Sequence, residues 1–407
     1  MSMKNYLVSE RMMQLITQLI LVLIVLFFLF SSAGAAEARY RSEVSGWIPY
    51  WTDEDGVEAV IDNLGDIDIL YLFVYQVDAE GELVLKVDLE DAVWKKLIKI
   101  ARRKDVLLMP TIAWFDGDAI HETLSSRKKM RAHVRAIEEM VDDMRFDGVN
   151  IDYEQKKAET IDYFSDFLNE LEDELGRDDL SCTIEARTPP TSRWKVVPEK
   201  IEWANDYKAM NKYCDWVEIM TYDQMRADLN LNKERRGVPY MPVADIDWVE
   251  KVLTYALQDI DADKIMLGIP TYGRAWDVTV APQWYRDYDK VATLNYSRIL
   301  ELAKKYNAPI GRSAGGEGVI SYFPEGSTWE LLNALPTPED TPKGFEAAAK
   351  ALMVATYANV EIPVRFVSWS DAESVEDKLD LIEEYDLKGA AFFSFNGEED
   401  ENIWDLF

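Results

Sequence analysis

The stretch FDGVNIDYEQ, residues 146–155, decides the fold and the site that this sequence predicts. After Gly148 the stretch alternates between apolar and polar residues, and its polar set is Asn150, Asp152 and Glu154. Side chains two apart on a β-strand point to the same face. A strand in this position would therefore align an amide and two carboxylates on one face and end at Glu154.

Two interpretations of this polar face are open. In an ordinary half-buried strand the polar face lies against water, and the alternation then carries no function. The flanking segments have helical periodicity, however, which predicts a parallel sheet whose strands are covered on both faces. Carboxylates are rarely buried without a partner, so aligned acids in a covered strand indicate a functional site. We favour the site.

Eight segments have the length and composition of strands, and amphipathic segments of helical length separate them. The strands are expected at residues 44–51, 67–75, 106–114, 148–153, 181–186, 216–222, 264–272 and 389–395. This order predicts parallel βαβ units that close into a (β/α)8 TIM barrel of the α/β class. The predicted organisation assigns barrel strands one to seven to residues 37–276, a small α+β insertion to 277–363, and the last α/β unit to 364–407.

Residues 1–36 form a separate N-terminal segment. Lys4 and Arg11 precede an apolar run over residues 15–30, and small residues follow at positions 33–36. This is the order of a secretory signal peptide with cleavage near Ala35 or Ala36, although the long apolar run leaves an uncleaved membrane anchor open. We expect export to the extracellular space or the cell envelope, with membrane contact only through such an anchor.

The composition excludes several classes of function. The formal net charge of -31 comes from 75 acidic and 44 basic residues without a basic cluster, so nucleic acid is not an expected partner. Because the chain has only two histidines, His121 and His133, a Ser-His-Asp triad or a His-rich zinc site is not expected. We expect catalysis by carboxylates and tyrosines, with no metal and no cofactor. Cys182 and Cys214 could form a disulfide or remain buried thiols, and the sequence leaves both open.

The carboxyl ends of the predicted strands combine acidic, amide and aromatic side chains. In a barrel of this kind the active site forms at that face. The residues at the strand ends are Tyr50, Trp51, Tyr75, Gln76, Trp114, Phe115, Asp152, Glu154, Glu185, Arg187, Tyr222, Asp223, Gln224, Tyr272, Arg274, Phe393 and Phe395. Any single aromatic residue among them could be core, but their clustering predicts a cleft for a hydroxyl-rich ligand, in which sugar rings stack on aromatic faces.

Four motifs in chain order resemble glycoside hydrolase family 18, the group of chitinases and endo-N-acetylglucosaminidases. Residues 147–154, DGVNIDYE, are similar to the DGxDxDxE signature of the fourth strand in that family. SGW at residues 45–47 resembles its first strand, MTYD at 220–223 its sixth, and LGIP with YGR at 267–274 its seventh. The resemblance covers most of the chain, and it implies the same barrel with an insertion after the seventh strand.

The resemblance implies a retaining hydrolase in which the substrate supplies the nucleophile. Glu154 would protonate the glycosidic oxygen, Asp152 would orient the N-acetyl group, and Tyr222 would hydrogen-bond the acetamido oxygen. Further substrate contacts are expected from Asn150, Tyr50, Trp51, Trp114, Asp223, Gln224, Arg274 and Phe393. The expected partner is a glycan that contains N-acetylglucosamine, namely chito-oligosaccharides, chitin or peptidoglycan, and we expect a monomer.

The sequence also departs from the family pattern. Asn150 replaces the middle acid of the signature, a variant that resembles the chitobiase and spore-cortex-hydrolase branches, and it could still hydrogen-bond Asp152. Phe393 stands where a Trp usually forms the floor of the sugar subsite. Two alternatives are weighed: a non-catalytic, lectin-like protein on this fold, and a metal-dependent hydrolase that uses Asp147 with the two carboxylates of the fourth strand. The retained acid at Glu154 argues against the first, and the shortage of histidine argues against the second.

Overall fold

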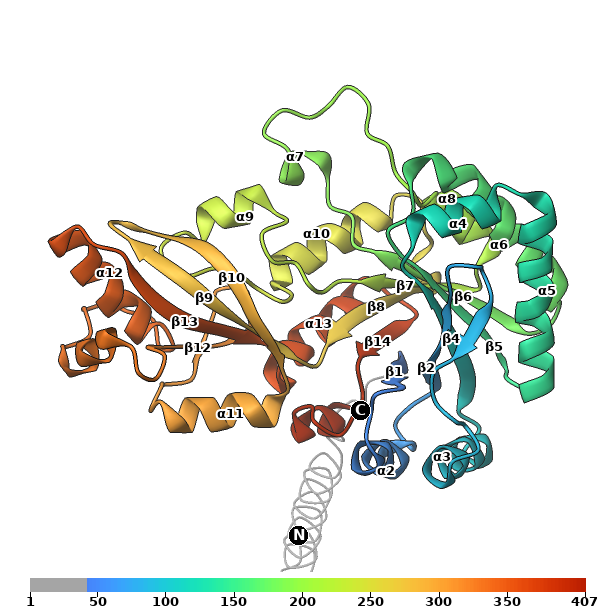
Figure 1. The fold of residues 1–407 in the computed structure, drawn as a ribbon, viewed down its shortest axis with the longest axis horizontal. Coiled ribbons are helices and arrows are strands. Elements are labelled where there is room, and N and C mark those ends of the chain that lie inside the picture. Colours follow the sequence, from blue (N-terminus) through green and yellow to red (C-terminus); the bar gives the residue numbers. More distant parts are fainter. Residues whose placement is uncertain (1–41) are drawn as a thin grey trace, which may run out of the picture. The chain divides into compact units, whose positions relative to one another are not determined.

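A closed barrel of eight parallel strands forms the centre of the computed structural model, which describes residues 42–407 (Figure 1). The strands are β1 (Glu43–Pro49), β2 (Ile69–Val77), β4 (Leu107–Trp114), β5 (Gly148–Tyr153), β6 (Asp179–Glu185), β7 (Trp216–Met220), β8 (Ile265–Pro270) and β14 (Gly389–Phe393). Strand β1 pairs with both β2 and β14, which closes the barrel. The predicted (β/α)8 barrel is confirmed, whereas the signal or anchor expected in residues 1–36 lies outside the described residues.

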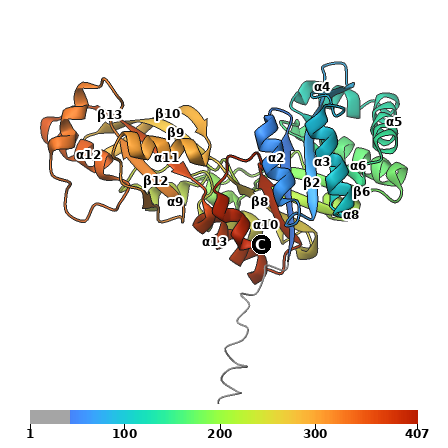
Figure 2. The ribbon, with the colours of Figure 1, turned by 90° about the horizontal axis from the view of Figure 1, so that it is seen from below.

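Helices cover the outside of the barrel, as Figure 2 shows from a second direction. They are α2 (Glu54–Asn63), α3 (Ala92–Arg103), α4 (Gly117–Leu124), α5 (Arg127–Met144), α6 (Ile161–Leu175), α8 (Tyr207–Tyr213), α10 (Ile246–Ala256) and α13 (Ala372–Glu384). Two short helices, α7 (Pro190–Arg193) and α9 (Leu229–Glu234), lie on the long connections that follow β6 and β7 (Figure 1). Short 3-10 turns lie at η1 (Ala158–Thr160), η2 (Ala262–Lys264) and η4 (Glu401–Leu406), and β3 (Leu83–Leu85) pairs antiparallel with β2. No helix within residues 42–407 has the length and apolar composition needed to cross a membrane.

The alternation of each strand divides its side chains between the barrel interior and the helical layer. On β4, Met109 and Ala113 belong to the cluster that fills the barrel, together with Trp47 and Trp216. Trp114, the next residue, packs outward against residues of the helical layer. The register places Ala113 opposite Asp152, so the carboxylate of β5 also points into the barrel.

A second, antiparallel sheet occupies the chain between the seventh and eighth barrel strands. It contains β9 (Gly273–Ala281), β10 (Trp284–Leu294), β11 (Gly311–Arg312), β12 (Gly318–Tyr322) and β13 (Ile362–Trp369), in the order β10-β9-β13-β12-β11. The helices α11 (Tyr296–Lys305) and α12 (Glu346–Ala358) and the 3-10 turn η3 (Thr328–Ala334) belong to the same region. The sheet starts and ends outside residues 277–363, the range expected for the insertion, because its strands β9 and β13 include residues 273–276 and 364–369.

The two cysteines form a disulfide, which resolves the alternative that the sequence leaves open. Cys182 lies on β6 and Cys214 directly precedes β7, and their Cα atoms are 6.1 Å apart. Because β6 and β7 are neighbours in the barrel, the bond closes a loop across adjacent strands. Both cysteines are buried.

Candidate active site

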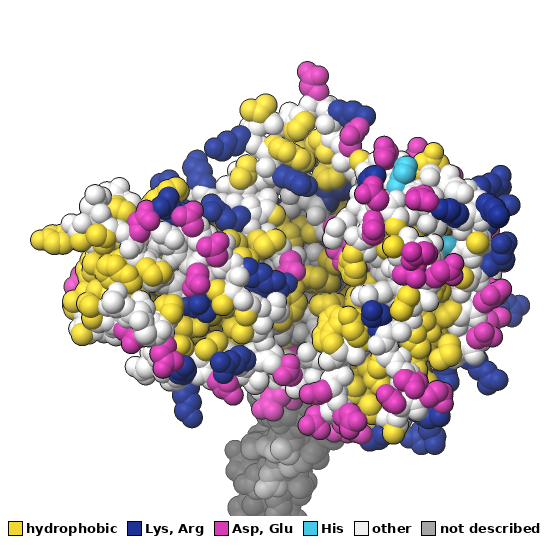
Figure 3. Space-filling view, in the orientation of Figure 1, with side chains coloured by type: hydrophobic (Ala, Val, Ile, Leu, Met, Phe, Trp, Pro, Cys, Tyr) yellow, Lys and Arg dark blue, Asp and Glu magenta, His cyan; other side chains and the backbone are white. Residues whose placement is uncertain are grey.

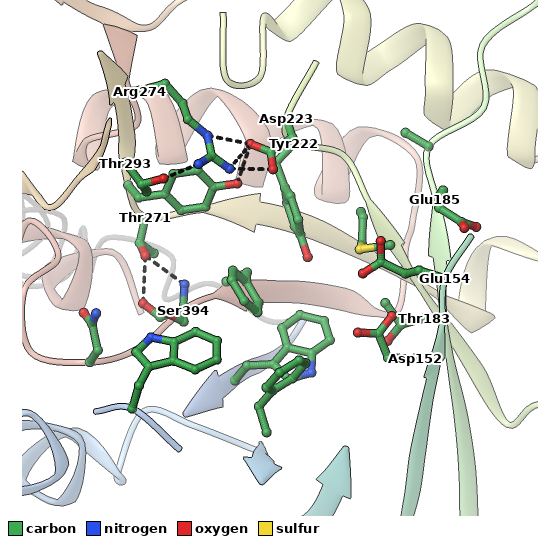
Figure 4. Close-up of a pocket in the computed structure, with 18 of the residues that line it drawn as sticks. Asp152, Glu154, Thr183, Glu185, Tyr222, Asp223, Thr271, Arg274, Thr293 and Ser394 are labelled. Atoms are coloured by element: carbon green, nitrogen blue, oxygen red, sulfur yellow. Dashed lines mark hydrogen bonds and ion pairs between the residues drawn. The ribbon is translucent and has the colours of Figure 1, made fainter. Parts of the chain in front are cut away.

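Strand β5 carries the central residues of the candidate site. All of its residues are buried, and it begins at Gly148, where a Cβ atom would lie 2.1 Å from the carbonyl oxygen of Asp179 on β6. Only glycine allows that close approach of the two backbones. Asp152 and Glu154 then line a cleft of about 840 Å³ at the carboxyl ends of the barrel strands (Figure 4).

The two carboxylates have an environment that favours their protonated forms. Asp152 is 5% exposed, and its Oδ1 has no hydrogen-bond partner among the described residues. Burial, followed by the charge of Glu154, raises the pKa of Asp152 well above its usual value. Burial and then the charge of Glu185 raise the pKa of Glu154 to about 7, against the opposing effect of Lys156. The site therefore holds a carboxylic acid that can keep its proton near neutral pH.

Asn150 lies deeper in the barrel than the two carboxylates and is fully buried. Its Nδ2 donates to Ser181 Oγ at 2.8 Å and to Glu218 Oε2 at 3.1 Å, and its Oδ1 accepts from Thr111 Oγ1 at 2.9 Å. The predicted hydrogen bond from Asn150 to Asp152 and the predicted substrate contact are both absent, because the carboxamide of Asn150 hydrogen-bonds to residues of the barrel interior. Asn150 connects strands instead of lining the cleft.

Glu218 is the carboxylate that partners Asn150 in this network. It also accepts hydrogen bonds from the hydroxyl of Tyr71 and from Trp216 Nε1, the latter at 2.7 Å. Burial raises the pKa of Glu218 to about 7, although these hydrogen bonds oppose the shift. The barrel interior below Asp152 therefore contains an acid that the four motifs do not include.

Tyr222 and Phe393 form one aromatic wall of the cleft. Their rings stack with centroids 5.8 Å apart, and Figure 4 shows the hydroxyl of Tyr222 on the side of Glu154. That hydroxyl makes no hydrogen bond to another described residue. Phe73 and the 54% exposed Trp51 continue the wall, with ring centroids 5.7 Å apart. The cleft thus presents apolar ring faces next to two acids, which is the combination that sugar rings require.

Asp223 is held by cationic and phenolic partners from the start of the second sheet. Arg274 Nε donates to Asp223 Oδ1 at 2.9 Å and Nη2 to Oδ2 at 2.6 Å, and Tyr272 donates its hydroxyl to Oδ1 at 3.0 Å. Asp223 has a positive φ of 54°, so its carboxylate leaves the line of β7 and turns toward β9. This bidentate pair fixes one rim of the cleft.

Besides Asn150, three predicted substrate-binding residues do not reach the cleft. Trp114 is 1% exposed and packs edge-on against Tyr153, with centroids 5.3 Å apart, because it lies on the outward face of β4. Gln224 is buried, and its Oε1 accepts from the backbone of Asp245 at 2.9 Å, so it anchors the loop after β7. Tyr50 packs edge-on against Trp51 and is not among the lining residues. Of the catalytic and substrate-binding residues predicted from the sequence, those that line the cleft are Trp51, Asp152, Glu154, Tyr222, Asp223, Arg274 and Phe393.

The comparison with family models identifies the chain. The model described as "Glycosyl hydrolases family 18" matches residues 15–398. The chain belongs to this family. The predicted resemblance is confirmed, and membership in family 18 makes the protein a glycosidase.

Family-18 relatives are distant in sequence. The uncharacterized glycosylase YvbX of Bacillus subtilis is 22% identical over 292 residues, which cover 71% of this chain and 69% of that protein. The chain covers only 44% and 49% of two further relatives from the same organism. The structure of the spore cortex-lytic enzyme SleL from Bacillus cereus matches with a TM-score of 0.66 at 21% identity, over 91% of this chain and 74% of that one. A chitinase from Chromobacterium violaceum matches with a TM-score of 0.65 at 20% identity, over 90% and 98%. These structures share the fold.

The family-18 motifs do not include every residue that forms the site. Glu185 ends β6 and lines the cleft, where Asn205 Nδ2 donates to its Oε2 at 2.8 Å. From the sequence, Glu185 could form an ion pair with Arg187 or contact the substrate. In the structure Asn205 lies between the Glu185 and Arg187 side chains and hydrogen-bonds both. Trp248 lines the cleft from helix α10 and does not lie at the end of a predicted strand in the sequence. No motif or periodicity in the sequence therefore predicts it as a site residue. Glu218 shares a strand face with Tyr222, so the burial argument used for Asp152 could have found it.

No group of three or more His, Cys, Asp or Glu side chains within residues 42–407 is arranged to hold a metal ion. His133 is buried in α5, its Nδ1 lies 3.1 Å from the carbonyl oxygen of Gly81, and its other ring nitrogen pairs with the hydroxyl of Tyr153. Burial lowers the pKa of His133 to about 4. This histidine belongs to the packing between barrel and helix.

Proposed function

We propose that the protein is an exported retaining glycosidase that cleaves β-1,4 bonds of N-acetylglucosamine-containing glycans by substrate-assisted catalysis. The observation that carries the proposal is the pair on β5: Glu154, with its pKa raised to about 7, beside Asp152, whose buried Oδ1 has no partner. The substrate classes are chito-oligosaccharides, chitin and peptidoglycan. No protein cofactor takes part.

In the first step Glu154 donates its proton to the glycosidic oxygen. The carbonyl oxygen of the substrate's own acetamido group attacks the anomeric carbon, the bond to the leaving sugar breaks, and a cyclic oxazolinium forms. The unpartnered oxygen of Asp152 accepts a hydrogen bond from the acetamido N–H, which orients the group for attack. A carboxyl oxygen that lacks a protein partner is suited to that role.

In the second step Glu154, now a carboxylate, takes a proton from water. The water attacks the anomeric carbon from the side that the leaving sugar vacated, and the oxazolinium ring opens to restore the acetamido group. The configuration at the anomeric carbon is retained, and the enzyme returns to its starting protonation state.

The aromatic wall and the Asp223–Arg274 pair at the rim of the cleft position the sugar for these steps. The hydroxyl of Tyr222 donates to the acetamido oxygen during attack, and burial together with nearby tyrosine and carboxylate groups raises its pKa, so that it keeps its proton. Phe393 and Trp51 stack on sugar faces. Asp223, held by Arg274, accepts hydrogen bonds from substrate hydroxyls.

Export of the protein as a monomer is part of the same proposal. The disulfide between Cys182 and Cys214 supports an oxidising compartment outside the cytosol. The charge of -31 supports a solvated surface and is unfavourable for self-association. Whether the N-terminal segment is cut or retained as an anchor can be read from the N-terminus of the purified protein.

The variant Glu154→Gln tests the proposed reaction. Gln keeps the shape of the side chain but cannot donate a proton, so we expect hydrolysis of chitotetraose and of purified peptidoglycan to fall by at least about 100-fold, as general acid catalysis contributes that much. Product analysis by chromatography and mass spectrometry gives the preferred glycan and the retained anomer. The control is Glu139→Gln on the exposed face of α5, which should hydrolyse at the wild-type rate.

Full activity of Glu154→Gln would contradict the proposal. Binding of chitotetraose by the wild type without any turnover of either glycan would support a carbohydrate-binding protein on this fold instead.

A further inference from the structure

A cationic groove adjoins the catalytic cleft. The long connection between β6 and α8, residues 186–206, and the loop that follows β7 form two overlapping cavities of about 470 and 380 Å³. Ala186 lines both of them and the catalytic cleft, and Trp248 lines the cleft and the smaller cavity. The groove therefore lies directly beside the catalytic cleft.

The charge of the groove is opposite to that of the protein. Its charged lining consists of Lys156, Arg187, Arg193, Lys200 and Arg226 against Glu185 and Glu202. Five cations against two carboxylates give a formal charge of +3, whereas the whole chain carries -31. Figure 3 shows Lys and Arg side chains around the protruding loop that carries α7, at the top of the view.

The three arginines are held in position without carboxylate partners. Arg187 lies between two rings, with its Cζ 4.0 Å from the centroid of Trp203 and 4.1 Å from that of Tyr207, and its Nη2 donates to the backbone of Asn205 at 2.9 Å. Arg193 and Arg226 are exposed and lie over aromatic rings. No carboxylate of the described residues is within salt-bridge distance of any of the three.

A buried hydrogen-bond donor without a partner in residues 42–407 belongs to a residue that lines both the groove and the cleft. The indole Nε1 of Trp248 is buried without a hydrogen-bond partner among the described residues, although Trp248 lines both spaces. Buried donors are normally satisfied, so this N–H is free to donate to an acceptor that a ligand brings into the adjoining space. Planar guanidinium groups on aromatic platforms and a free N–H donor are together suited to a carboxylate.

We propose that this groove binds a carboxylate carried by the glycan, so that the enzyme prefers acidic N-acetylglucosamine glycans to neutral ones. A preference in hydrolysis rests on the proposed function, whereas binding of the carboxylate by the groove does not depend on it. The cleft alone predicts the opposite preference, because its lining also holds Glu185, Asp223 and Glu398 against the single cation Arg274. The sign of the charge preference therefore distinguishes the groove from the cleft.

Binding to the full chain carrying Glu154→Gln tests the proposal without turnover. The probes are peptide-free peptidoglycan strands of four sugars with free carboxylates, the same strands with each carboxylate converted to a methyl amide, and chitotetraose. We expect the free-carboxylate strand to bind about tenfold more tightly than its amide in titration calorimetry, an amount that two partly exposed charge contacts can supply. The difference should shrink as salt rises. Strands that keep their peptides form a second arm, which separates a carboxylate on the sugar from one on the peptide.

The variant pair Arg193→Gln and Arg226→Gln, made together, identifies the groove as the source. We expect it to lose most of the preference while its binding of chitotetraose is unchanged. Arg135→Gln is the matched control, because Arg135 is also exposed and lies on α5, away from the groove. Equal binding of free and amidated strands in both arms, or the same loss in Arg135→Gln, would overturn the proposal. Failure of the wild type to hydrolyse any probe would count against the proposed function alone.

Discussion

A single residue, Glu185, both lines the cleft and affects the acidity of Glu154. It lines the cleft, and its charge is the largest effect after burial in raising the pKa of Glu154 to about 7. A general acid must be protonated to act, so hydrolysis should fall as pH rises through that value. The neighbouring carboxylate therefore extends activity toward neutral pH.

The variant Glu185→Gln should move the alkaline limb of kcat/KM to lower pH. Removing a negative neighbour makes ionisation of Glu154 easier, so its pKa falls and the acid form is lost earlier. The measurement is a pH profile with a chito-oligosaccharide. Glu398→Gln is the control, since Glu398 lines the cleft but is not among the groups that raise the pKa of Glu154. An alkaline limb at the wild-type position in Glu185→Gln would contradict this explanation.

Asn150 shows why a residue in a family signature can have a structural role. Restoring the family acid with Asn150→Asp would replace the donor that reaches Ser181 and Glu218 by a second buried carboxylate. We expect a loss of about 3 kcal/mol in the free energy of unfolding at pH 8, the usual effect of an uncompensated buried charge. The loss should be smaller at pH 5, where the added acid is protonated.

Urea unfolding at the two pH values measures this loss. Asn150→Asp combined with Glu218→Gln should recover part of the stability at pH 8, because the repulsion between the two carboxylates is gone. A loss of equal size at pH 5 and pH 8 would show that the charge is not the cause.

Strand β5 sets the geometry of the site at the scale of an element. Its alternation made the inward direction of Asp152 predictable, because a parallel strand covered on both faces leaves few other places for aligned acids. Strand ends are harder to interpret. Trp114 and its neighbour Ala113 end the same strand on opposite faces, and only the register shows that Ala113 is the inward one.

Loops and helices were less predictable than the strands. Gln224 follows a residue with positive φ and precedes another, so the chain reverses direction and the amide turns away from the cleft. Such turns depend on contacts with distant segments, here the start of α10, and not on local periodicity. Trp248 comes from that helix, and no local pattern distinguishes it from an ordinary core tryptophan.

The variant Gly148→Ala tests the close approach of β5 to β6. The added methyl group would lie 2.1 Å from a backbone oxygen of Asp179, so the strands must separate at the start of β5. We expect about 3 kcal/mol of destabilisation, at the upper end of the range for overpacking. Thermal or urea unfolding measures it. Gly237→Ala is the control, because nothing lies within 4 Å of its added methyl group, and equal stability of the two variants would contradict the expectation.

Buried acids give the whole molecule a pH-dependent stability. Glu218 has a folded pKa of about 7 against an ordinary value of 4.5, and Asp152 and Glu154 are shifted in the same direction. Groups with raised pKa values favour the fold while protonated, so their contribution is complete below about pH 4.5 and is lost as pH rises through 7. The urea midpoint should therefore be higher at pH 5 than at pH 8.

One part of that change can be assigned to Glu218. The shift of Glu218 alone corresponds to about 3 kcal/mol between the two pH values. Glu218→Gln should reduce the dependence by about that amount, whereas Glu139→Gln on the surface should leave it as in the wild type. A urea midpoint that rises from pH 5 to pH 8 would contradict the prediction.

The disulfide has a consequence for the integrity of the chain. The connection that forms the cationic groove lies entirely within the covalent ring that Cys182 and Cys214 close. This connection includes an exposed stretch, residues 195–200, of the kind that proteases cut first. A single cut there would leave both fragments joined by the sulfur bridge, so the nicked protein would migrate as one chain until a reductant separated it. The loop nearest the substrate can thus be cleaved without the barrel losing either half.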